Sequence, residues 1–227
     1  KRELTDLDFD YAAVKDSSGL MVGYVSREDL DKSSGPLREE HLKPVLTLHL
    51  VSEELTLQAL FQMMAEVEAM FVMSGRSVTG IVTRIDLFKP AGSFFAFGQL
   101  SLLETLLKQD LHDTFDCDEM HEFLSVGRAE KTDALHESLT KQKLERRWVD
   151  SLQFADLGTI SKKGGRPIVE AMGMSGRNWE NFMKKAGAVR NSIAHASEVS
   201  GDYQQLVEAI LNTRRAVEAL LKQASGT

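Results

Sequence analysis

The stretches VGYVSREDL (residues 22–30) and TGIVTRIDL (residues 79–87) lie 57 positions apart and decide the fold of the first part of the chain. Gly, Val, Arg, Asp and Leu coincide in the two stretches, and Ser26 corresponds to Thr83. Self-similarity at a fixed offset indicates an internal repeat, in which each copy forms the same supersecondary unit.

The residues before each stretch predict two adjacent strands. The β-type runs YAAVK (11–15) and AMFVM (69–73) are separated from the quoted stretches by small turn residues. Upstream of the second copy, apolar residues at helical spacing predict a helix, at Leu57, Leu60, Phe61, Met64 and Val67. The predicted unit is strand, helix, strand, strand, helix. The offset places the opening strand and most of the first helix of the first copy before Lys1, so we expect a native N-terminus further upstream.

A hydroxyl and a carboxylate recur where the last strand of each copy meets the following helix. Ser26 precedes Asp29, and Thr83 precedes Asp86, with the same spacing of three. One interpretation needs no ligand, because Ser/Thr-x-x-Asp is a variant of the capping box that satisfies the free amides of a first helical turn. Two copies in register also favour a second interpretation, in which the same groups bind a ligand.

This repeat resembles a tandem pair of CBS domains, modules that bind adenine nucleotides as regulatory ligands. The resemblance covers residues 1–90, with the first copy incomplete. It implies that the hydroxyls of Ser26 and Thr83 and the helix N-termini meet phosphate. It also implies that Asp29 and Asp86 accept hydrogen bonds from ribose hydroxyls. The expected ligand is an adenine nucleotide of the AMP, ADP or ATP type, and clefts that stay empty are the alternative.

The second half of the chain carries helical patterns only. Pro90, Gly92 and Gly98 break the pattern, so residues 91–98 are predicted to be a linker. Residues 99–227 are predicted to form an all-α bundle of about four or five helices, at 100–112, 131–145, 147–161, 178–197 and 203–223. The predicted fold class is thus an α+β N-terminal CBS pair followed by an all-α helical bundle, in two domains.

The charge distribution is uneven along the chain, although the net charge is −7. Residues 104–137 hold 10 acids and 3 bases, whereas residues 141–190 hold 11 bases and 5 acids. The basic segment would attract a polyanion, or it is simply a solvated face. No apolar run approaches the roughly 18 residues of a membrane span. Cys117 is the only cysteine, so we expect a reducing, cytoplasmic location and no membrane.

Three polar residues that would be costly to bury, Arg190, Asn191 and His195, lie at the end of the basic segment. Counted at about 100° per residue, Asn191 and His195 lie opposite an apolar stripe of their helix, and Arg190 lies on its flank. The members of that stripe are Phe182, Ala186, Val189 and Ile193. The spacing of four lets the amide of Asn191 orient the imidazole of His195.

The stretch VRNSIAH (189–195) resembles the signature of HEPN domains, in which four to six residues separate an Arg from a His. Catalytic members of that family are metal-independent endoribonucleases that dimerise so that two motifs line one cleft. The resemblance implies a homodimer that cleaves single-stranded RNA and leaves 2′,3′-cyclic phosphate ends. His195 would exchange protons with the 2′-hydroxyl, and Arg190 would neutralise the phosphate in the transition state. Asn191 would hold the imidazole or contact the phosphate.

The geometry of one helix makes a second chain, or a break in the helix near residue 190, necessary for this chemistry. Five residues separate Arg190 from His195 by about 140°, so we expect a composite site from two chains. Nucleotide binding to the CBS pair is expected to change the stacking of the two chains and thereby open or close that cleft. The alternative is a non-catalytic regulatory protein, in which Arg190 pairs with Glu180 or another carboxylate and the bundle serves dimerisation or partner binding.

One cluster of possible metal ligands is better interpreted as an acidic solvated turn. HDTFDCDEMHE (112–122) matches no recognised ligand spacing, and its mixed hard and soft ligands select no obvious ion. No metal site is therefore predicted.

Overall fold

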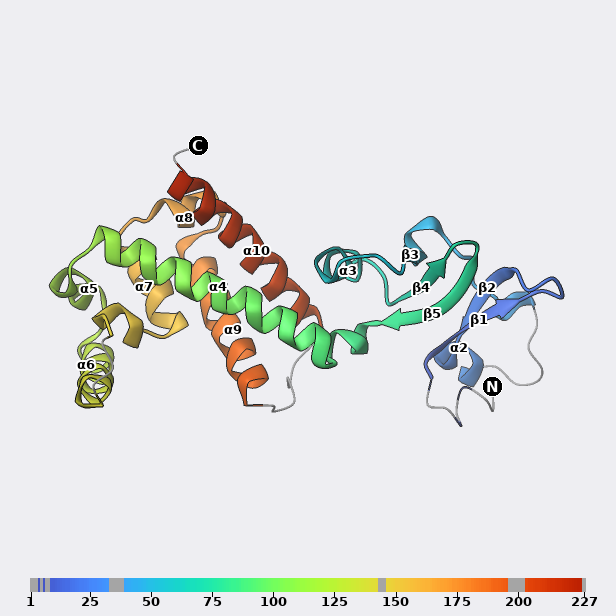
Figure 1. Cartoon of the computed structure of the whole chain (residues 1–227), viewed down its shortest axis with the longest axis horizontal. Coiled ribbons are helices and arrows are strands. Elements are labelled where there is room, and N and C mark those ends of the chain that lie inside the picture. The colour runs from blue at the N-terminus through green and yellow to red at the C-terminus, as the bar shows by residue number, and fades with distance from the viewer. Residues whose placement is uncertain are drawn as a thin grey trace. The chain divides into compact units, whose positions relative to one another are not determined.

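The computed structural model describes residues 4, 6, 9–32, 39–142, 146–195 and 203–225. The chain is of mixed α+β class, with a small sheet region first and a mostly helical part after it (Figure 1). It divides into two compact units, Lys1–Leu87 and Phe88–Thr227. Each unit is described by itself.

The N-terminal unit contains two small sheets. Strand β1 (Tyr11–Lys15) pairs antiparallel with β2 (Met21–Ser26), and helix α2 (Arg27–Lys32) follows. The second sheet has the order β3-β4-β5, with β3 parallel and β5 antiparallel to β4. Its elements and the short turns around it are η1 (Glu39–His41), η2 (Thr47–His49), β3 (Leu50–Ser52), α3 (Leu57–Met63), β4 (Ala69–Ser74), β5 (Ser77–Thr83) and η3 (Arg84–Phe88).

The predicted strand pairs are confirmed, and the two hairpins share an irregularity. Val14 faces Gly23 in the first hairpin, and Val72 faces Gly80 in the second. Directly after each pair the register shifts by a bulge. A bulge bends the strand and increases its twist, so the repeat seen in the sequence is also a repeat of backbone geometry.

The chain segment at Leu42 and Lys43 packs against the first hairpin. The peptide of Lys43 exchanges two hydrogen bonds with that of Tyr24, 3.0 and 2.8 Å long. A Cβ on Gly23 would lie 2.5 Å from Cγ of Leu42. Glycine is therefore required at this position by the close approach of the neighbouring chain segment.

The C-terminal unit is helical. Its elements are α4 (Pro90–Thr114), α5 (Cys117–Phe123), α6 (Val126–Lys141), η4 (Trp148–Ser151), α7 (Phe154–Lys163), α8 (Pro167–Ala171), α9 (Gly176–Ala194) and α10 (Tyr203–Ser225). Helix α9 packs against α4, α7 and α10. No helix among the described residues is long and apolar enough to cross a membrane.

The predicted linker at residues 91–98 is wrong, because these residues form the first turns of α4. Pro90 occupies the start of the helix, where a missing amide hydrogen costs nothing. Ala96 is fully buried, so packing outweighs the low helix propensity of Gly92 and Gly98.

The stretch predicted as an acidic turn contains helix α5, which the periodicity does not reveal. Asp116 accepts a hydrogen bond from the amide of Glu119, and the Glu119 carboxylate accepts one from the amide of Asp116, each 2.9 Å long. This reciprocal capping box, together with the buried Met120, stabilises seven residues as a helix.

The core of the helical unit orients α9. Leu100, Leu103, Leu107 and Leu111 of α4 are fully buried. Trp179 of α9 is also fully buried, and its indole N–H donates to the carbonyl of Gly158, 3.2 Å away. A Cβ on Gly158 would lie 2.8 Å from Cβ of Met183, so α7 and α9 approach closely.

Candidate functional site

Helix α9 carries the candidate residues, and the predicted orientation of its faces is confirmed. Ser175 caps its start by accepting a hydrogen bond from the amide of Asn178. Phe182, Ala186 and Val189 are buried and Ile193 is half-buried, whereas Asn191 and His195 are exposed. The polar end of α9 is therefore accessible.

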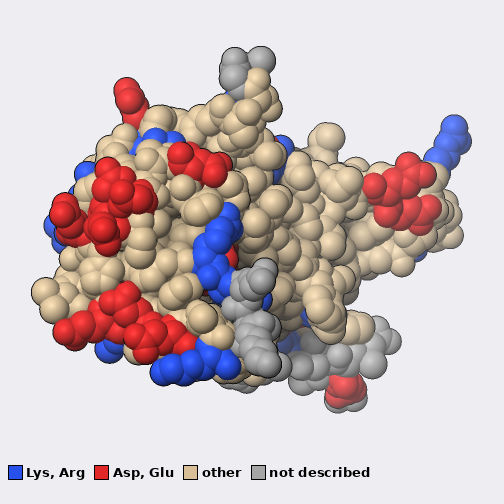
Figure 2. Space-filling model, turned by 60° about the vertical axis from the view of Figure 1, so that its left-hand side comes forward, with Lys and Arg blue, Asp and Glu red and all other residues tan. Residues whose placement is uncertain are grey.

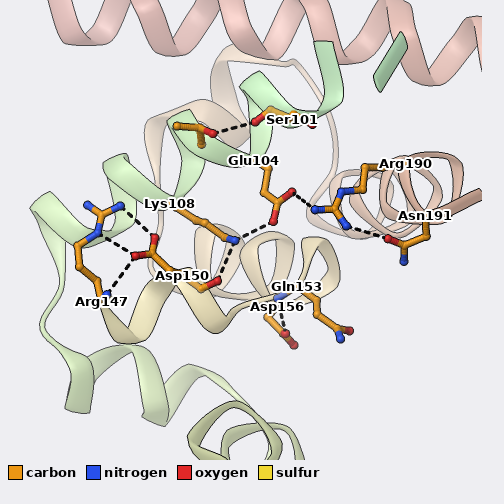
Figure 3. A network of polar contacts seen from close by, with 10 residues as sticks. Ser101, Glu104, Lys108, Arg147, Asp150, Gln153, Asp156, Arg190 and Asn191 are labelled. Carbon is orange, nitrogen blue, oxygen red and sulfur yellow. Dashed lines mark hydrogen bonds and ion pairs between the residues drawn. The ribbon is translucent and has the colours of Figure 1, made fainter. Parts of the chain in front are cut away.

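Arg190 lies between the two faces and is held by three groups. Its guanidinium lies 3.3 Å from Oε2 of Glu104 on α4 and donates to Oδ1 of Asn191 over 3.1 Å (Figure 3). The guanidinium carbon lies 5.9 Å from the centre of the Phe97 ring, within the range of a cation–π interaction. The buried Nε atom has no hydrogen-bond partner among the described residues.

Glu104 is shared with a second cation. Its Oε1 atom accepts a hydrogen bond from Nζ of Lys108, 2.7 Å away, and the same Nζ donates to the carbonyl of Asp150 over 3.1 Å (Figure 3). The side chains of Glu104 and Lys108 are only 14% and 12% exposed. Glu104, Lys108 and Arg190 thus form a compact cluster with one carboxylate and two cations.

Asp150 completes this cluster from η4. Burial alone would raise the pKa of its carboxyl, but the hydrogen bonds and the positive charge of Arg147 outweigh burial and hold that pKa below its usual value. Asp150 is therefore an ionised carboxylate that is paired mainly with Arg147, and it also interacts with the charge of Lys108.

An open pocket of about 410 Å³ borders this cluster. Glu104, Lys108, Asp150, Arg190 and Asn191 are among its lining residues. Charged and polar side chains therefore line much of the pocket. It holds more positively charged side chains than carboxylates that lack an ion-pair partner.

The structure does not bring His195 into the same pocket. His195 ends α9, and its amide donates to the carbonyl of Asn191 over 3.0 Å. Among the described residues, no hydrogen bond joins the Asn191 side chain to the imidazole, and Oδ1 of Asn191 accepts one from Arg190. One copy of the chain therefore places Arg190 and Asn191, but not His195, at the pocket.

The sequence does not predict which residues of α4 lie beside Arg190. Glu104 and Lys108 are four residues apart and so lie on one face of a helix that is otherwise rich in leucine. This spacing is visible in the sequence, but nothing local links it to residue 190.

The first candidate pair of the N-terminal unit lies at the end of β2. The hydroxyl of Ser26 donates to the carboxylate of Asp29, and the Asp29 amide donates to Oγ of Ser26 over 3.2 Å. Nζ of Lys43 lies 2.5 Å from the same carboxylate. The hydrogen bond from Lys43, followed by that from Ser26, lowers the pKa of Asp29. Ser26 and Asp29 thus form a cap that already contains a cation.

The second pair, at the end of β5, also joins a hydroxyl to a carboxylate, but with a different amide donor. Both the amide and the hydroxyl of Thr83 donate to Oδ2 of Asp86, over 2.7 and 3.0 Å. In both copies the hydroxyl donates to the carboxylate, and any ligand would have to exchange with these internal hydrogen bonds.

The charge pattern of the surface is mixed. On the face in Figure 2, acidic side chains gather in several patches, and basic side chains lie between them. Among the described residues, no group of three or more His, Cys, Asp or Glu side chains could hold a metal ion.

No family model, curated protein or solved structure matches this chain. Its function has to be inferred from its own geometry.

Proposed function

We propose that the helical unit is a HEPN-type, metal-independent endoribonuclease that acts on single-stranded RNA as a homodimer. One observation carries this proposal: Arg190 and Asn191 line an open polar pocket, while His195 is exposed at the end of the same helix. A second copy can supply the missing imidazole, because His195 of each chain is exposed and outside its own pocket.

The arrangement of charges supports the binding of a phosphodiester. Lys108 already neutralises Glu104 at 2.7 Å, closer than Arg190 at 3.3 Å. Arg190 can therefore turn to a phosphate oxygen without leaving a carboxylate unpaired. An imidazole exchanges protons near neutral pH and would accept the proton of the 2′-hydroxyl during in-line attack on phosphorus. The bond from phosphorus to the 5′-oxygen breaks, the leaving 5′-oxygen takes a proton from water, and the product carries a 2′,3′-cyclic phosphate.

The test uses a labelled single-stranded RNA with EDTA in the buffer. The wild-type chain is expected to cleave it and to leave 2′,3′-cyclic ends, whereas Arg190→Ala and His195→Ala each abolish cleavage. A mixture of the two variants is expected to regain part of the activity, because one site of the mixed dimer combines an intact Arg190 with an intact His195. Activity in neither the wild type nor the mixture would refute the proposal.

We further propose that the N-terminal unit binds an adenine nucleotide that regulates this activity. The support is the duplicated hairpin with the same bulge and the same hydroxyl–carboxylate pair at its end. ATP, ADP or AMP is expected to raise the melting temperature and to change the rate of RNA cleavage. Asp29→Ala and Asp86→Ala should each reduce the thermal shift. If none of the three nucleotides changes the melting temperature, nucleotide binding is refuted and the hydroxyl–carboxylate pairs have a structural role only.

A non-catalytic regulatory protein is the second candidate, and the ion pair between Arg190 and Glu104 favours it. In this alternative Arg190 ties α9 to α4, and the bundle serves dimerisation or partner binding. Intact RNA under every nucleotide condition, combined with a loss of stability in Arg190→Ala, would support this candidate over the nuclease.

A further inference from the structure

A second pocket, of about 490 Å³, lies between α9 and α10. Three carboxamides line it, from Asn178 and Asn181 on α9 and Asn212 on α10. Lys184 also lines it, and so does the nearly buried ring of Phe182. We call this pocket the asparagine groove.

The polar groups of the asparagine groove are available for a ligand. Within the described ranges, the side chains of Asn178, Asn181 and Asn212 have no hydrogen-bond partner, and Lys184 has no ion-pair partner. Lys185, by contrast, lies 3.7 Å from Glu208. The groove thus offers three amides, which both donate and accept, and one ammonium group without an ion-pair partner. The paired Lys185 and Glu208 line it as well.

The groove and the pocket at Arg190 lie on different sides of α9 and have one lining residue in common. Lys184 lines both of them. The ten residues from Asn181 to Asn191 rise about 15 Å along one helix, a distance that a few nucleotides of single-stranded RNA can span. A strand whose phosphodiester lies at Arg190 would therefore have to cross α9 at Lys184, the residue that lines both pockets, to reach the groove.

We propose that the asparagine groove binds the nucleotides next to the scissile phosphodiester of single-stranded RNA. This inference rests on the proposed nuclease function and adds a substrate-binding subsite to it. Lys184 contacts a phosphate between the two pockets. The carboxamides bind the donor and acceptor edges of unpaired bases, which single strands leave free.

The binding test uses a fluorescein-labelled ten-nucleotide RNA and the full chain with His195→Ala, so that cleavage cannot change the probe. In this background, Asn181→Ala combined with Asn212→Ala is expected to weaken binding about tenfold, from the loss of two sets of hydrogen bonds. Lys184→Ala should reduce the slope of log K against log salt concentration by about one. Gln223→Ala on α10 and Lys131→Ala on α6 are the matched controls and should leave binding unchanged.

Each alanine has a higher helix propensity than the residue it replaces, so the helices are expected to remain folded, which a melting curve checks. With His195 intact, the Asn181→Ala/Asn212→Ala variant should raise KM for the ten-nucleotide RNA and leave kcat unchanged. Cleavage of a dinucleotide, which is too short to reach the groove, should not change.

The outcomes separate this inference from the function on which it rests. Cleavage and binding that are the same in the groove variants and the controls would overturn the groove and leave the nuclease intact. RNA that binds through the groove but is never cleaved would refute the nuclease and retain the groove as an RNA site. A wild-type chain that binds no RNA would overturn both.

Discussion

The guanidinium of Arg190 lies 3.3 Å from Oε2 of Glu104, and the other oxygen of that carboxylate accepts a hydrogen bond from Lys108. Helices α9 and α4 are therefore joined by one carboxylate that serves two cations. Because Glu104 is only 14% exposed, water screens this cluster poorly, and its balance of charge matters for stability.

Replacement of Glu104 by Gln should destabilise the helical unit. Glu104→Gln leaves Lys108 and Arg190 close together without a negative charge between them, and we expect the free energy of unfolding to fall by about 2 kcal/mol. Urea denaturation followed by circular dichroism measures this change. The control is Glu137→Gln, which removes the exposed i,i+4 pair with Lys141 and should cost less than about 0.5 kcal/mol. Equal effects of the two changes would show that the cluster contributes nothing.

Alanine in place of glycine should have opposite effects at two helical positions. A Cβ on Gly187 of α9 would lie 2.8 Å from Cβ of Phe154, whereas a Cβ on Gly98 of α4 meets nothing within 4 Å. Gly187→Ala should therefore destabilise the unit by about 1–3 kcal/mol through overpacking. Gly98→Ala should stabilise it by up to about 1 kcal/mol, because alanine has the higher helix propensity. Melting temperatures that shift in the same direction would contradict the packing of α9 on α7.

The two equivalent glycines of the repeat should also differ. A Cβ on Gly23 would lie 2.5 Å from Leu42 and 2.7 Å from the carbonyl of Lys43, but the nearest atom to a Cβ on Gly80 is 3.8 Å away. Gly23→Ala is expected to unfold the N-terminal unit at lower denaturant concentration, and Gly80→Ala to leave it nearly unchanged. Hydrogen exchange of the strand amides provides the measurement, and similar protection in both variants would refute the close approach of Leu42.

The carboxylate of Asp133 should make stability depend on pH. Hydrogen bonds from Trp148 and then from His121, 2.8 Å each, lower its pKa in the folded protein. A lowered folded-state pKa stabilises the fold above the unfolded value of about 3.9, and this contribution is lost as the pH falls through the folded value. Wild type should therefore exceed Asp133→Asn in stability at pH 7, and the difference should shrink below about pH 4.

Unfolding at pH 7 and at pH 3, followed by tryptophan fluorescence, gives the two differences. A constant difference for Asp133→Asn at the two pH values would mean that its charge has no part in the effect.

Local patterns predicted the elements that depend on neighbours in sequence. The hairpins followed from β-type runs around small turn residues, and the buried and exposed faces of α9 followed from its helical period. The start of α4 did not follow, since Pro90 and Gly92 are also normal signals for a break. Helix α5 was missed because its capping box lies in a stretch whose acidic residues obscure the apolar period.

The sequence by itself determined the duplicated hairpin units, their capping pairs, and the exposure of Asn191 and His195, because each of these depends on spacing along a few residues. Only the tertiary structure decided the partner of Arg190. Glu180, on the same helix, forms an ion pair with Lys162 of α7 at 2.9 Å. The ion-pair partner of Arg190 is Glu104 of α4. The physical reason is that charge pairing follows from which helices pack together, and that packing is set by buried side chains far apart in the sequence.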